Sequence, residues 1–152
     1  MEHGMKAAEL FLQGYNCAQS VLLAFEDVTG LPKSMALRLS SSFGGGMARL
    51  REVCGAVSGM AMVAGLLYGY EDISDITLKK EHYARIQELA AAFRERTGSI
   101  ICREILNDPP TDPNPSPRTA EYYKIRPCAQ MVLIAGEVLD AYIAAHPISE
   151  EI

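Results

Sequence analysis

The chain has 152 residues and a mass of 16.6 kDa, a size typical of one domain. Hydrophobic residues make up 49% of it and charged residues 22%, so it can bury an ordinary globular core. The formal net charge of -5, with no basic stripe in the sequence, excludes a typical nucleic-acid-binding protein, which presents a basic face.

Hydrophobic periodicity predicts helices along the whole chain and no strand with an alternating pattern. The segment at residues 107–119 holds five of the eight prolines and predicts a loop. We therefore expect an all-α fold, a single compact helical bundle of about five to seven helices that residues 1–152 form as one domain. In chain order, the expected helices cover residues 4–13, 17–28, 32–42, 50–69, 75–97, 99–106 and 127–145.

The helix expected at residues 50–69 contains two glycine pairs with i, i+4 spacing, Gly55 with Gly59 and Gly65 with Gly69. Each glycine costs a helix about 1 kcal/mol relative to alanine, so this repeated use predicts a close approach by a neighbouring backbone. We expect this helix at the centre of the bundle, although the same pairs would also serve a contact between two copies of the chain. The triple glycine at 44–46 is interpreted as a flexible turn, with an anion-binding loop as the second interpretation.

The apolar segments and the first residues indicate where the protein resides. Residues 1–4 lack the basic start of a signal peptide. The most apolar run, residues 56–68, is shorter than the roughly 18–20 residues that a bilayer span requires. We therefore expect no membrane insertion and a cytoplasmic location, where cysteines tend to be catalytic or metal-binding rather than joined in stable disulfides.

All four cysteines stand where a helix is expected to begin. Asn is a preferred N-cap residue and Pro is favoured at the first helical position; Asn16 precedes the first cysteine and Pro127 precedes the last. Free backbone N–H groups and the positive end of the helix dipole stabilise a thiolate at such a position. The thiolate is both the nucleophile and the metal ligand, so the pattern indicates sulfur chemistry at Cys17, Cys54, Cys102 and Cys128.

The expected topology allows these thiols to meet. Alternate helices of an up-down bundle start at the same end, which brings Cys17 near Cys54. The helix expected at 75–97 returns the chain to that end, where Cys102 follows. The proline-rich connection of roughly 20 residues is long enough to bring Cys128 there as well.

Three interpretations of the four cysteines are open. In the first, Cys54 is the nucleophile, activated by the nearby Arg51, and Cys17 resolves the mixed disulfide. In the second, the four thiolates ligate zinc or an iron–sulfur cluster, although no Cys-x-x-Cys motif is present. In the third, they are core residues of a structural or interaction module. The residues do not identify a cofactor, and they leave open whether the protein is an enzyme.

Three strings and two isolated cysteines carry a family resemblance. The strings are GYNCAQS at residues 14–20, FGGGM at 43–47 and CGAVSG at 54–59, and Cys102 and Cys128 follow them. Over nearly its whole length the chain resembles the C_GCAxxG_C_C family of small proteins, named for its four cysteines. The resemblance implies a redox role with an unidentified partner. It also implies association with a transporter system, because genes of the family often lie beside transporter genes.

Overall fold

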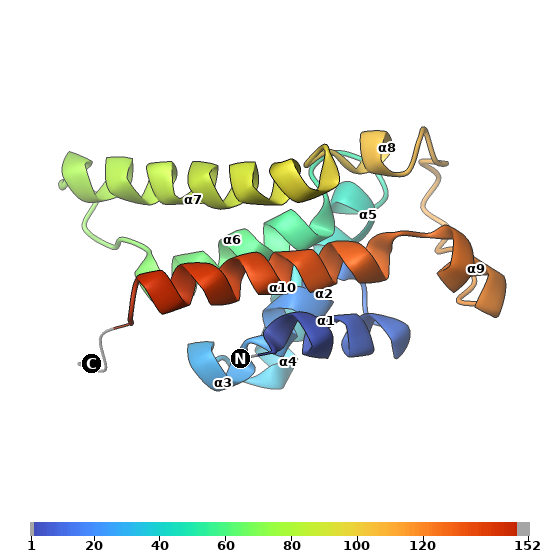
Figure 1. Cartoon of the computed structure of the whole chain (residues 1–152), viewed down its shortest axis with the longest axis horizontal. Coiled ribbons are helices and arrows are strands. Elements are labelled where there is room, and N and C mark those ends of the chain that lie inside the picture. Colours follow the sequence, from blue (N-terminus) through green and yellow to red (C-terminus); the bar gives the residue numbers. More distant parts are fainter. Residues whose placement is uncertain (1, 149–152) are drawn as a thin grey trace.

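The computed structural model describes residues 2–148, which form helices and loops with no strand (Figure 1). An isolated antiparallel bridge joins Val53 and Ile101. The expected all-α fold is confirmed. The helices are α1 (His3–Leu12), α2 (Cys17–Ala24), α3 (Glu26–Thr29), α4 (Lys33–Ser40), the 3-10 helix η1 (Ser41–Phe43), α5 (Gly44–Met47), α6 (Gly55–Tyr68), α7 (Ile76–Thr97), α8 (Cys102–Ile105), α9 (Ala120–Ile125) and α10 (Cys128–Ala145).

The described residues contain more helices than the expected five to seven. Even without α5, whose backbone is partly left-handed, nine α-helices are present between residues 2 and 148. The helix expected at 17–28 breaks at Phe25, where φ is -100° and ψ is 19°, and this break separates α2 from α3. A further helix, α9, follows the proline-rich loop and begins at the cap residue Thr119, which accepts a hydrogen bond from the backbone of Tyr122.

Three long helices set the shape of the molecule (Figure 1). The chain runs in the same direction through α6 and α10 and in the opposite direction through α7, so α6, α8 and α10 all begin at one end. The short α2 begins at that end too, and it packs against α1, α4, α6 and α10. The topology that we expected from an up-down bundle is therefore present for these four helix starts.

The helix at the centre of the fold is α2 rather than the glycine-rich α6, so this part of the prediction is wrong. Seven of the eight residues of α2 are buried, against seven of fourteen in α6. The predicted close approach by a neighbouring backbone is present for one of the two glycine pairs only, Gly55 and Gly59. A Cβ on Gly55 would lie 3.0 Å from the Cβ of Cys17, and one on Gly59 would lie 2.9 Å from the backbone oxygen of Ala18. A Cβ on Gly65 would meet no neighbour within 4 Å.

The triple glycine opens a left-handed turn. Five consecutive residues, Gly45 to Arg49, have φ between 49° and 68°, and Arg51 has φ 62°. Left-handed backbone costs an L-residue about 1–2 kcal/mol, and three of the five carry a Cβ. Backbone hydrogen bonds from residues 49, 51 and 52 to the carbonyls of residues 44, 45 and 46 hold the turn together. The segment is therefore a defined and strained structure, whereas we expected a flexible turn.

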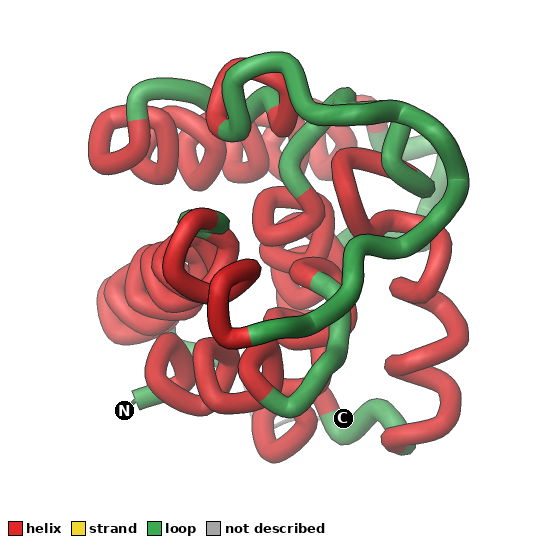
Figure 2. Tube along the Cα trace, turned by 90° about the vertical axis from the view of Figure 1, so that its right-hand side faces the viewer, coloured by secondary structure: helices red, strands yellow, loops and turns green. Residues whose placement is uncertain are grey.

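The proline-rich loop at residues 107–119 crosses the end of the molecule where these helices begin (Figure 2). Arg118 fixes its last part. The guanidinium group donates to the carbonyl oxygens of Phe11 at 3.0 Å and Tyr15 at 3.1 Å. It also lies 4.4 Å from the centre of the Phe11 ring. The loop is thus attached to α1 and covers one side of the space between the helix starts.

Away from this space, a polar network around a buried histidine joins α1, α3 and α10. His3 is only 5% exposed, and its ring stacks on Phe25 with the centroids 4.2 Å apart. Its Nδ1 lies 2.7 Å from a carboxylate oxygen of Asp140, and its Nε2 lies 2.9 Å from one of Asp27. Both ring nitrogens therefore face a carboxylate acceptor.

By length and composition alone, α10 is apolar enough to cross a membrane. In this structure 44% of it is buried against the other helices, chiefly α1, and core helices of soluble proteins pass the same test. The length of α10 is therefore weak support for a membrane span.

Candidate functional site

The four cysteines line one cavity at the end where the helices begin. The first residues of α2, α8 and α10 are cysteines, and the fourth is the N-cap of α6. The cavity has a volume of about 330 Å³. The expectation that the thiols converge is thus confirmed for all four residues, Cys17, Cys54, Cys102 and Cys128.

Local backbone structure fixes two of these positions. A capping box begins α2, because the side chain of Asn16 accepts from the backbone of Gln19 while the Gln19 side chain accepts from the backbone of Asn16. Asn16 thereby orients Cys17. At the start of α10, Pro127 is the N-cap residue directly before Cys128, as the sequence predicts.

A short backbone pairing brings the other two cysteines together. The N–H of Cys54 donates to the carbonyl of Ile100 at 2.7 Å, and the N–H of Cys102 donates to the carbonyl of Glu52 at 2.7 Å. This antiparallel pairing between two loops has no signal in the hydrophobic pattern, because it is too short. It places Cys54 and Cys102 on two paired segments of the cavity wall.

Cys17 and Cys128 line the same cavity and shift each other's pKa in opposite directions. The hydrogen bond from Cys17 is the largest influence on Cys128 and lowers its pKa below the usual value, and the guanidinium groups of Arg126, Arg118 and Arg51 lower it further. The partner behaves oppositely: the same hydrogen bond and burial raise the pKa of the Cys17 thiol well above 9.0. Of the two, Cys128 is therefore the more acidic thiol and Cys17 the less acidic one.

The other two thiols stay protonated at neutral pH. Burial raises the pKa of Cys54 to about 12, despite hydrogen bonds from the N–H groups of Ala56 and Val57. Burial also raises the pKa of Cys102, although Arg51 opposes the increase. The sequence argument gave every cysteine a stabilised thiolate. It fails for three of four, because loss of hydration outweighs the first-turn N–H groups.

Arg51 does not activate Cys54 as expected. Its Nη1 donates to the Sγ of Cys102 at 3.7 Å, and its Nε donates to the carbonyl of Pro110 at 2.9 Å. The side chain is only 2% exposed. Arg51 therefore belongs to the cavity floor beside Cys102 and Cys128.

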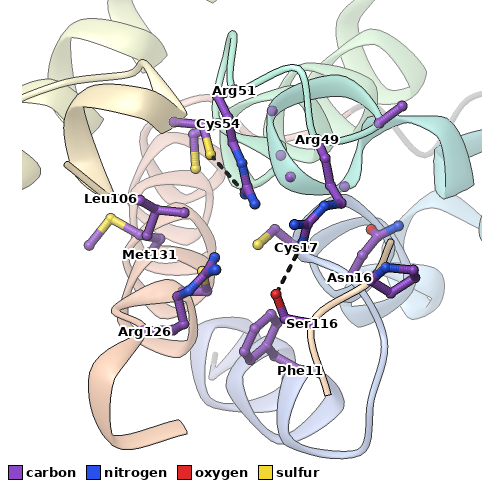
Figure 3. Close-up of a pocket in the computed structure, with 18 of the residues that line it drawn as sticks. Phe11, Asn16, Cys17, Arg49, Arg51, Cys54, Leu106, Ser116, Arg126 and Met131 are labelled. Carbon is purple, nitrogen blue, oxygen red and sulfur yellow. Dashed lines mark hydrogen bonds between the residues drawn. The ribbon is translucent and has the colours of Figure 1, made fainter. Parts of the chain in front are cut away.

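Four guanidinium groups surround the thiols, and the described part of the chain contributes no carboxylate to the cavity lining. Figure 3 shows Arg49 and Arg51 extending into the cavity from one segment and Arg126 from another. The fourth enters from the proline-rich loop. Two of them were not singled out from the sequence, although Arg126 stands two residues before Cys128 in the printed chain. The four residues are Arg49, Arg51, Arg118 and Arg126.

The arrangement of the thiols bears on metal binding. Within residues 2–148, no three His, Cys, Asp or Glu side chains lie close enough together to hold one metal ion. The thiols surround the cavity instead of pointing at one centre.

Comparison with known proteins gives one result. A family model described as "Putative redox-active protein (C_GCAxxG_C_C)" matches residues 15–142. No curated protein and no solved structure matches the chain. The matched range contains all four cysteines and all four arginines of the cavity.

Proposed function

Because the chain belongs to the C_GCAxxG_C_C family, described as redox-active, we propose that its cavity carries out thiol–disulfide exchange with a small substrate. The attacking group is the thiolate of Cys128, and the resolving group is the thiol of Cys17. The observation that supports this proposal is that Cys17 and Cys128 line one cavity, where the guanidinium groups of Arg126, Arg118 and Arg51 lower the pKa of Cys128. This assignment differs from our expectation of Cys54 as the nucleophile.

The reaction has two steps. The Cys128 thiolate attacks one sulfur of an oxidised substrate, so that a bond forms between the two sulfurs and the substrate's leaving group departs with the electron pair. Cys17 then loses its proton and attacks the Sγ of Cys128, which releases the substrate sulfur as a thiolate and leaves a Cys17–Cys128 disulfide. Two electrons pass from the Cys17–Cys128 pair to the substrate, and the one proton that Cys17 loses goes to a leaving group. An external dithiol reverses the disulfide.

The remaining thiols provide a second couple. Cys54 and Cys102 are adjacent through the backbone pairing of their segments, and both are buried. With raised pKa values they are weak nucleophiles at neutral pH. In the proposal they exchange with the Cys17–Cys128 disulfide and pass the oxidation on to the external dithiol. A reducing compartment such as the cytoplasm supplies that reductant.

Competition between the four thiols tests the assignment. The reduced protein is treated with substoichiometric iodoacetamide at pH 7, and alkylated peptides are quantified by mass spectrometry over time. We expect Cys128 to react first, because it has the largest thiolate fraction. After mild oxidation with diamide, the peptide map should show a Cys17–Cys128 linkage. Cys102→Ser, a change in the same cavity, should preserve both results.

Three kinds of result would contradict the proposal. If Cys54 is alkylated first, or if oxidation joins Cys17 to Cys54, the original sequence assignment is the better one. If protein purified without oxygen contains stoichiometric zinc or iron that all four thiols ligate, the cavity is a metal centre. Replacement of each cysteine with serine that alters stability alone would indicate a structural module.

A further inference from the structure

One nitrogen in the cavity has no partner. The Nη2 of Arg51 is buried and makes no hydrogen bond with any described residue, although the other nitrogens of the same guanidinium do. A buried charged donor without an acceptor costs free energy, because it has lost its hydration without gaining a hydrogen bond. Folded proteins rarely leave such a donor unsatisfied unless it serves a purpose at that place. An anionic acceptor bound in the cavity would satisfy it.

The charge around this nitrogen also favours an anionic ligand. Arg126 also lines the cavity and, within residues 2–148, has no carboxylate at ion-pair distance; its guanidinium lies 5.3 Å from the centre of the Tyr122 ring. Arg49 has one carboxylate nearby, that of Asp112 at 3.8 Å, which is half exposed. The chain as a whole is acidic, with a net charge of -5. This excess of positive charge is therefore local to the cavity.

The charges are concentrated near one sulfur. Arg126, Arg118 and Arg51 all lower the pKa of Cys128, so an anionic group attracted by them would lie close to the attacking atom. The rest of the lining is largely apolar, with Met131, Ile105 and Leu106 among its residues. The volume of about 330 Å³ admits a small organic molecule and excludes a folded protein segment.

From these observations we infer that the substrate is a small sulfur electrophile with an oxyanion next to its reactive sulfur, such as an S-sulfonate (R–S–SO₃⁻). Arg51 and Arg126 bind the oxyanion and direct the adjacent sulfur at Cys128. This inference rests on the proposed thiol chemistry and adds the substrate class to it. Attack by the Cys128 thiolate forms Cys128–S–S–R and releases sulfite, which departs with the electron pair while the arginines stabilise its charge. Cys17 then displaces R–S⁻ from Cys128, and that thiolate takes a proton.

A pair of alkylating reagents separates anion binding from thiolate reactivity. Iodoacetate and iodoacetamide differ in charge and react with the same Cys128 thiolate, so the thiolate fraction cancels in the ratio of their rate constants. We expect this ratio to fall roughly tenfold in Arg51→Gln and in Arg126→Gln, because a cleft lined by positive charge concentrates anions. Arg103→Gln is the matched control: this arginine follows Cys102, is about half exposed, and does not line the cavity.

Sulfate supplies a second measurement that needs no reaction. It should slow iodoacetate alkylation of the wild-type protein competitively and should have little effect in the Arg51→Gln variant. Arg51→Lys, which keeps the charge, controls for loss of folding in the glutamine variant and should retain part of the selectivity. Equal reagent ratios in wild type and both glutamine variants, or an alkylation rate that sulfate leaves unchanged, would overturn the inference.

Reduction assays then separate the two proposals. The wild-type protein should reduce S-sulfocysteine faster than the uncharged 2-hydroxyethyl disulfide. If the neutral disulfide is reduced as fast and sulfate does not bind, the substrate class is wrong while the thiol chemistry survives. If sulfate protects Cys128 in an arginine-dependent way but neither compound is reduced, the anion site survives and the exchange reaction is wrong.

Discussion

His3 and Arg51 are two buried basic side chains at different places in the fold, and their surroundings differ. The ring nitrogens of His3 each contact a carboxylate, from Asp140 and Asp27. Arg51 has neutral acceptors for two nitrogens and none for the third. Stability favours complete pairing of buried polar groups. The His3 network is therefore structural, and the incomplete pairing of Arg51 is typical of a site that awaits a ligand.

The largest expected effect on the free energy of unfolding is that of replacing His3. His3→Ala removes both contacts of the ring with carboxylates. Asp140, whose side chain is 15% exposed, then keeps the backbone N–H of residue 3 as a donor but loses the ring. We expect a loss of about 3 kcal/mol in the free energy of unfolding, measured in urea. Asp27 is 55% exposed, so Asp27→Asn should cost less than about 1 kcal/mol. The alkylation rate of Cys128 should not change, and a change would mean that the two regions are coupled.

Alkaline pH should destabilise the cavity region through Cys54. The pKa of Cys54 is about 12 when folded and about 9.0 when unfolded. Below pH 9 both states hold the proton. Above it the unfolded state releases the proton first, so stability is lost as pH rises toward 12. At pH 10 the wild type should have lost about 1 kcal/mol more than Cys54→Ala, relative to pH 8. Equal losses in the two proteins would show that Cys54 is hydrated.

The smallest effect on stability is expected for Arg51→Met. The variant loses two hydrogen bonds but also removes a buried charge whose third nitrogen is unsatisfied. We expect its unfolding free energy to stay within about 1 kcal/mol of the wild type. The pKa of Cys128 should rise, because a positive charge that lowers it is gone. A pH profile of Cys128 alkylation measures this shift, and a stability loss as large as that of His3→Ala would make Arg51 structural too.

The sequence predicted the positions of the thiols well, because each lies beside local helix-start signals. Asn16 and Pro127 are such signals, and the structure starts a helix at each. The sequence predicted the chemistry of the thiols poorly. The pKa of Cys54 depends on burial, and the state of Cys128 depends on guanidinium groups from the distant loop and from α9's end. Neither effect has a local pattern in the chain.

The break at Phe25 and the backbone pairing of Cys54 with Ile100 were missed for a related reason. Phe25 belongs to a continuous apolar stretch that suits a longer helix, but its ring is buried against His3 from α1. The pairing at Cys54 spans too few residues for an alternating pattern to develop. Both features arise from contacts between segments that are far apart in sequence.

The left-handed turn at residues 45–49 stores backbone strain at the edge of the cavity. Two arginines of the cavity, Arg49 and Arg51, belong to the segment whose backbone carries the strain. An anion held by these side chains would offset part of that cost. Binding of an anion would therefore stabilise the folded form of this segment, because the two equilibria are linked.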